Sequence, residues 1–99
     1  MTTSDSAICR KVVEMFGADL QQMVAIEEIG ELLQAISKRA GGKDNRDNLA
    51  EEIADVEIML YQLKVMFNVS DDEVFKVKIQ KAKREKERLE NHGRKQTKI

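Results

Sequence analysis

The segments IEEIGELLQAISK (residues 26–38) and NLAEEIADVEIMLYQLK (residues 48–64) decide the fold of this chain. In both, apolar residues recur every three or four positions, which is the period of a helix with a buried face. The intervening AGGKDNRD (residues 40–47) combines two glycines with polar side chains, as turns do. The pattern predicts two long helices joined by a short loop.

Weaker signals extend this prediction to both ends of the chain. Residues 7–16 predict a short helix, and the second helix then runs over about 19–39. We expect the third helix from Asp47 or Asn48, with Asn48 as a candidate N-cap, to about residue 67. Ser70 and Glu73 are spaced as a capping box, which predicts a basic fourth helix that ends near residue 90.

The predicted architecture is an all-α, antiparallel helical bundle that forms one domain over residues 1–99. Its two long central helices are flanked by the short N-terminal helix and the basic C-terminal helix. Residues 1–6 and 91–99 are polar ends of the chain, and we expect them to be flexible tails.

Composition limits the class of protein. A length of 99 residues suits one domain, and the single cysteine, Cys9, excludes an internal disulfide framework and a cysteine-based zinc site. No apolar run approaches the roughly 18 residues of a membrane span, and the first residues do not resemble a secretory signal. We therefore expect a cytoplasmic protein that does not bind a membrane.

Apolar residues cover more of the long helices than one small bundle can bury. The third helix has one apolar stripe from Leu49 to Phe67 and a second group round the other side, so it should be buried on several sides. We expect a homo-oligomer, either a dimer or a tetramer, to complete the bundle. The broad apolar face predicted for the second helix contains Ala25, Ile26, Ile29, Leu32, Leu33 and Ile36, and the aromatic residues expected in the core are Phe16, Tyr61, Phe67 and Phe75.

Acidic side chains occur in pairs on both long helices. Glu28 and Glu31, and again Glu52 and Asp55, are three positions apart, which places each pair on neighbouring turns of one helix face. Such a pair is usually a solvated surface, but both pairs here adjoin apolar residues and have few Lys or Arg nearby. If the two helices bring all four carboxylates together, repulsion and burial oppose the grouping unless a cation binds. An all-oxygen set favours Mg²⁺ or Mn²⁺.

The same acids carry a resemblance to a known family. EEIGE at residues 27–31, followed by EIAD at residues 52–55, resembles the E-E-x-x-E … E-x-x-D signature of the MazG-like, all-α nucleoside triphosphate pyrophosphohydrolases. The similarity covers about residues 15–90. It implies a Mg²⁺-dependent enzyme, with Mn²⁺ as a possible substitute, that cleaves a nucleoside triphosphate between the α and β phosphates and releases pyrophosphate.

The resemblance also implies roles for individual residues. Glu27 becomes an accessory catalytic group that orients water or a ligand, and Glu31 a catalytic carboxylate as well as a ligand. The metal ligands implied by the signature are Glu28, Glu31, Glu52 and Asp55.

Basic residues are concentrated at the end of the chain. Residues 70–99 carry 10 basic and 6 acidic side chains, a net charge of +4, whereas residues 1–69 carry 7 and 12, a net charge of −5. The family often places cations on the last helix to hold substrate phosphates, and Lys78 and Lys81, followed by Arg84, match that pattern best.

Gln34 and Lys38 project from the acidic side of the second helix and are further candidates for contacting base or phosphate. A different class of function stays open from the residues alone. It is a helical, dimeric interaction module whose basic last helix binds nucleic acid or an acidic partner. Under the enzyme hypothesis no nucleic-acid partner is expected.

Overall fold

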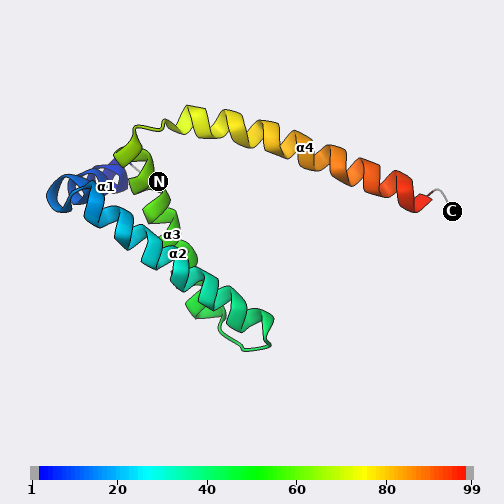
Figure 1. The fold of residues 1–99 in the computed structure, drawn as a ribbon, viewed down its shortest axis with the longest axis horizontal. Coiled ribbons are helices and arrows are strands. Elements are labelled where there is room, and N and C mark those ends of the chain that lie inside the picture. The colour runs from blue at the N-terminus through cyan, green and yellow to red at the C-terminus, as the bar shows by residue number, and fades with distance from the viewer. Residues whose placement is uncertain (1–2, 98–99) are drawn as a thin grey trace. The chain divides into compact units, whose positions relative to one another are not determined.

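The computed structural model describes the backbone of residues 3–97 and the side-chain burial of residues 6–93. The described chain is entirely helical: α1 spans Thr3–Phe16, α2 Ala18–Ala40, α3 Arg46–Phe67 and α4 Asp71–Thr97 (Figure 1). The chain divides into two compact units, Met1–Asn68 with α1, α2 and α3, and Val69–Ile99 with α4. The predicted all-α class is therefore confirmed for the described residues.

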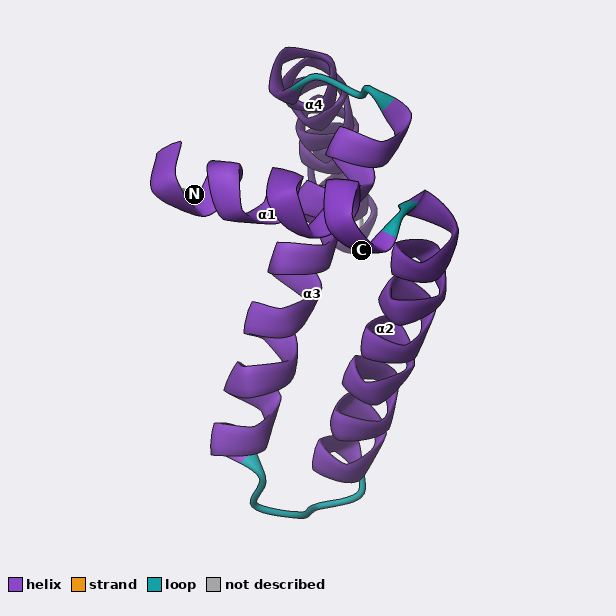
Figure 2. Ribbon diagram, turned by 90° about the vertical axis from the view of Figure 1, so that its left-hand side faces the viewer, coloured by secondary structure: helices purple, strands orange, loops and turns teal. Residues whose placement is uncertain are grey.

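Within the first unit, α2 and α3 lie side by side and the short loop after Ala40 joins them (Figure 2). The two helices contact each other extensively, and α1 packs on both. In Figure 2, α1 crosses the end of the pair where α2 begins and α3 finishes. Cys9 of α1 is buried.

Local chemistry explains where the helices end. Gly17 separates α1 from α2 with a φ of 86°, a conformation that costs glycine little. Asn68 ends α3 in the left-handed conformation, with its N–H donating to carbonyls of the last turn. The predicted capping box before α4 is confirmed: Glu73 N–H donates to Ser70 Oγ over 3.0 Å, and Ser70 N–H donates to the Glu73 carboxylate over 2.7 Å.

Other predicted helix ends are wrong. α1 begins at Thr3 instead of residue 7, and α4 continues to Thr97, well past residue 90. The N-cap of α3 is Asn45, so Asn48 lies inside the first turn of the helix. The reason is that the run from Arg46 to Asn48 is polar but fully compatible with a helix, and polar residues give no signal for where a helix starts.

The broad apolar face predicted for α2 is only partly covered within the chain. Of the broad apolar face, Ala25 is buried, but Ile26 (64% exposed) and Leu33 (62% exposed) lie open. The contact runs instead along small and polar residues, because the side chains of Ala25 and Ala35 allow the helices to approach closely. We call this contact the α2–α3 seam; its residues are Gln21, Ala25, Glu28 and Ala35 on α2 and Glu52, Asp55, Met59 and Gln62 on α3.

The predicted aromatic core is also wrong for three of its four members. Phe16, Phe67 and Phe75 are all more than half exposed, while Tyr61 is half-buried. A single chain therefore leaves much of its apolar surface uncovered, on both long helices of the first unit.

The second unit consists of α4 and the short stretch before it. Its ion pairs lie on its own surface, between Lys76 and Asp72 (3.4 Å) and between Arg88 and Glu85 (2.8 Å). Across the described part of the chain, we find no helix with the combination of length and apolar character that crossing a membrane requires.

Candidate metal centre

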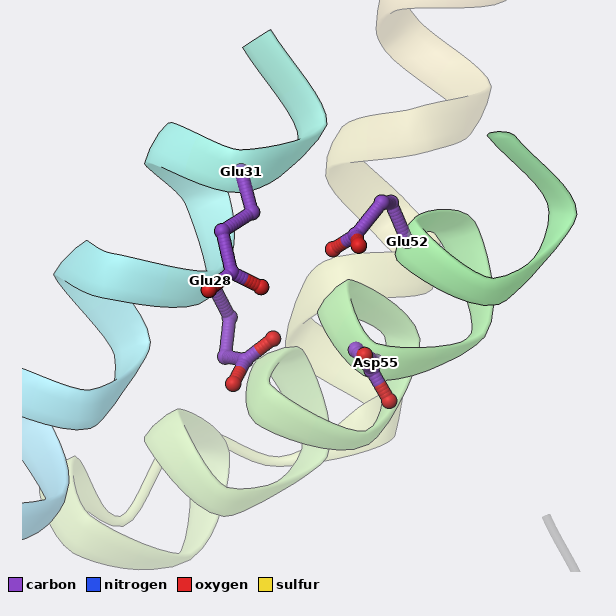
Figure 3. Close-up of side chains that lie close together, drawn as sticks. All are labelled: Glu28, Glu31, Glu52 and Asp55. Atoms are coloured by element: carbon purple, nitrogen blue, oxygen red, sulfur yellow. The ribbon is translucent and has the colours of Figure 1, made fainter. Parts of the chain in front are cut away.

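Four carboxylates meet at the α2–α3 seam, three from seam residues and one from Glu31 at its edge (Figure 3). Each of them offers one oxygen, and these four oxygens all lie within 4.8 Å of one another. Opposite oxygens around an octahedral Mg²⁺ are about 4.2 Å apart, so small side-chain movements suffice to surround one ion. We call this group the carboxylate cluster; its members are Glu28, Glu31, Glu52 and Asp55.

Helix periodicity explains why these acids face inward. Glu28 lies one turn after the buried Ala25, and Asp55 lies one turn before the buried Met59. A residue three or four positions from a buried one shares its helix face. Glu28 and Asp55 therefore share helix faces with buried residues, while Glu31 is exposed at the edge of the group.

The electrostatics of the cluster are unfavourable in the absence of an ion. Burial raises the pKa of Glu28 above its ordinary value, and the negative charges of its three acidic neighbours raise it further. Burial also raises the pKa of Glu52, and the charges of Glu31 and Asp55 raise it further, while a hydrogen bond from Asn48 acts in the opposite direction. No cationic side chain is among the groups that set these two pKa values.

Two oxygens of the cluster test directly whether a cation fits. Oε2 of Glu28 and Oε2 of Glu52 are shielded from solvent and have no hydrogen-bond partner. An unpaired buried carboxylate oxygen is costly, and a hard divalent cation is the partner that such oxygens accept. The donor set of the cluster therefore fits Mg²⁺ or Mn²⁺.

The other predicted site residues are exposed and lie outside the group of four carboxylates that offer ligand atoms to one ion. Glu27, Gln34 and Lys38 are exposed on α2, where Glu27 precedes the cluster residue Glu28 and the other two follow Glu31 by about one and two turns. The predicted phosphate-binding residues are exposed on α4, in the second unit; they are Lys78, Lys81 and Arg84.

Three polar residues near the cluster were missed from the sequence. Gln21 Nε2 donates to Gln62 Oε1 over 2.7 Å, and both side chains are buried on the seam. Asn45 Nδ2 donates to the carbonyl of Ala35 over 3.0 Å, which ties the start of α3 to α2. The sequence does contain one signal for the glutamines, because each is seven residues from a cluster acid and so lies on the same helix face.

Comparison with known proteins agrees with this geometry. The family model of the MazG nucleotide pyrophosphohydrolase domain matches residues 19–89, which include the whole carboxylate cluster. No curated protein and no solved structure matches the chain. The match covers most of the chain and confirms the resemblance carried by the two acidic motifs: the chain belongs to the MazG nucleotide pyrophosphohydrolase family.

Proposed function

We propose that this protein is a Mg²⁺-dependent hydrolase that cleaves ribo- or deoxyribonucleoside triphosphates between the α and β phosphates, giving the monophosphate and pyrophosphate. One observation carries the proposal. In a chain of the MazG family, four carboxylates converge within 4.8 Å and two of their shielded oxygens lack any partner. The phosphates of a nucleotide bind divalent cations, and the donor set of this cluster is suited to bind such cations as well.

Each part of the chemistry has a candidate residue. Glu28, Glu31, Glu52 and Asp55 would hold the ion, which would offset the charge of the triphosphate and lower the pKa of a nearby water. We assign to Glu31 the role of accepting the proton of the attacking water, because it is an exposed member of the cluster. Glu27 orients that water or the substrate from the adjoining position on α2.

The remaining candidates bind the substrate. Lys78, Lys81 and Arg84 supply positive charge for the phosphates, and Gln34 and Lys38 contact the base or a phosphate. This assignment rests on their charge and exposure and on the family pattern.

A panel of the common ribo- and deoxyribonucleoside triphosphates, assayed for pyrophosphate with Mg²⁺, tests the proposal. We expect release from at least one of them, and a loss of about 10³-fold or more in Glu31→Gln and Asp55→Asn, because ligand loss removes several kcal/mol of transition-state stabilisation. Lys78→Ala and Lys81→Ala should raise KM. Glu51→Gln is the matched control, since Glu51 is exposed on α3 and outside the cluster.

Two outcomes would count against the enzyme. The first is a folded, Mg²⁺-loaded protein that releases no pyrophosphate from any member of the panel. The second is a salt-sensitive affinity for nucleic acid that is lost with Lys78, Lys81 and Arg84, which would support the interaction module instead.

We also propose that a second copy of the chain covers the exposed apolar residues and completes an antiparallel bundle. The supporting observation is a stripe on α2 with exposed side chains at helical spacing: Ile26, Ile29, Leu33 and Ile36. Sedimentation velocity should show a dimer or tetramer at micromolar concentration, and Leu33→Glu should dissociate it. A wild-type protein that sediments as a monomer would contradict this proposal.

A further inference from the structure

Asn48 has a place in the structure that differs from the one its sequence context predicts. Because Asn45 is the N-cap of α3, Asn48 has no capping role. Its side chain points along the helix instead, and Nδ2 donates to Oε1 of Glu52, one turn later, over 3.4 Å. A hydrogen bond between side chains four positions apart stabilises a helix by about 0.2–0.5 kcal/mol, which is no more than the advantage of up to about 0.7 kcal/mol that alanine has over asparagine as a helix former, so a net gain in helix stability does not account for this residue.

The two oxygens of Glu52 have different surroundings. Oε1 accepts the hydrogen bond from Asn48, whereas Oε2 is shielded and has no partner. In Figure 3 the carboxylate of Glu52 reaches toward α2 and the glutamates there. The last torsion of a glutamate side chain is only weakly fixed by its own preferences, so a hydrogen bond on one oxygen determines where the other points.

The chemistry of the donor suits a neighbour of a cation. A lysine or arginine in the same place would neutralise Glu52 and repel the ion. The amide of asparagine has no charge, so it can hold one oxygen of the carboxylate while leaving the negative charge of the cluster intact.

We propose that Asn48 is a positioning residue that holds Oε1 of Glu52 and so presents Oε2 to the divalent ion. This inference rests on the proposed function, because it requires the cluster to bind an ion. The contact is longer than the usual 2.7–3.2 Å and is exposed to solvent. We therefore expect an effect at the lower end of the 10- to 100-fold range that such supporting residues have on metal affinity.

Titration with Mn²⁺, followed by loss of the free-ion electron paramagnetic resonance signal, measures the effect without any turnover. Asn48→Ala should weaken Mn²⁺ binding about tenfold, while its Tm in EDTA stays equal to that of the wild type or rises. Asn48→Gln, which keeps an amide donor one turn from Glu52, should recover most of the affinity. The matched control is Asn91→Ala, an exposed helical asparagine of α4, which should bind Mn²⁺ as the wild type does.

Any other result would contradict the positioning role of Asn48 or the proposed function. Equal Mn²⁺ affinity in Asn48→Ala and the wild type would overturn the positioning role while leaving the proposed function standing. The positioning role is also wrong if Asn48→Ala lowers the Tm in EDTA along with the affinity, or if Asn48→Gln binds as weakly as Asn48→Ala. A wild-type protein that binds no Mn²⁺ would overturn the proposed function itself, and this inference with it.

Discussion

The glutamine pair and the carboxylate cluster lie on the same seam and handle buried polarity in opposite ways. Gln21 and Gln62 are each about 5% exposed, and the amide of one donates to the carbonyl of the other. The cluster begins two turns away, yet its shielded oxygens on Glu28 and Glu52 have no partner within the chain. The glutamine pair thus forms its hydrogen bond within the chain, whereas two shielded oxygens of the cluster form none.

The two groups differ in what they contribute to the stability of the fold. A paired polar group in the interior contributes about 0.5–1.5 kcal/mol and fixes how two helices meet. Four neighbouring carboxylates with raised pKa values on Glu28 and Glu52 gain nothing of the kind, because each like charge opposes the others. The ion that we propose for this cluster would offset that repulsion.

The larger predicted effect lies at the glutamines. Gln62→Leu should lower the free energy of unfolding by about 1–3 kcal/mol, because it leaves the buried amide of Gln21 without an acceptor. The double variant Gln21→Leu/Gln62→Leu should recover much of that loss, since it removes both polar groups. Urea unfolding followed by circular dichroism measures the change, and Gln80→Leu, at an exposed position of α4, is the control.

The glutamine prediction fails if Gln62→Leu is as stable as the control variant. It also fails if the double variant is much less stable than the single one, because the pair would then be held by more than its own hydrogen bond.

In the ion-free protein, a substitution in the carboxylate cluster should change stability less than one in the glutamine pair, and in the opposite direction. Because the native pKa of Glu28 is raised, the native state holds its proton more tightly than the unfolded chain, and the contribution of Glu28 to the stability of the ion-free protein falls as the pH rises above about 4.5. Glu28→Gln should therefore raise the Tm in EDTA at pH 7, by less than Gln62→Leu lowers it. The gain should shrink as the pH is lowered toward 4.5. Differential scanning fluorimetry at a fixed protein concentration measures both trends.

Addition of Mg²⁺ sharpens the comparison. The wild type should gain stability, by about 2.7 kcal/mol at 100 times the Kd, whereas Glu28→Gln should gain much less. Two outcomes would contradict this prediction: a lower Tm for Glu28→Gln than for the wild type in EDTA, or an equal gain in stability of both proteins on addition of Mg²⁺. Either would show that the cluster does not depend on an ion.

Much of the fold could be predicted because its signals are local. Gly17, the two glycines after Ala40 and the Ser70–Glu73 capping box set breaks and starts that the structure reproduces. The polar ends were harder, since residues such as those around Asn91 form a helix without any apolar period to announce it. The convergence of the acids was expected from their spacing and from the family resemblance, while their role as ligands stays a proposal.

The sequence by itself determined that the chain is helical, that its acids lie three apart on two long helices, and that it belongs to the MazG family. Those properties depend on short-range periodicity and on motif spacing. Only the tertiary structure decided which face of α2 meets α3. The side of α2 with Ala25 and Ala35 is buried, whereas the side with Ile26 and Leu33 is exposed. The small side chains of the two alanines permit a close approach of the helices. That choice also brought the four carboxylates and the two glutamines to the same seam, because they share the helix faces that the close contact selects.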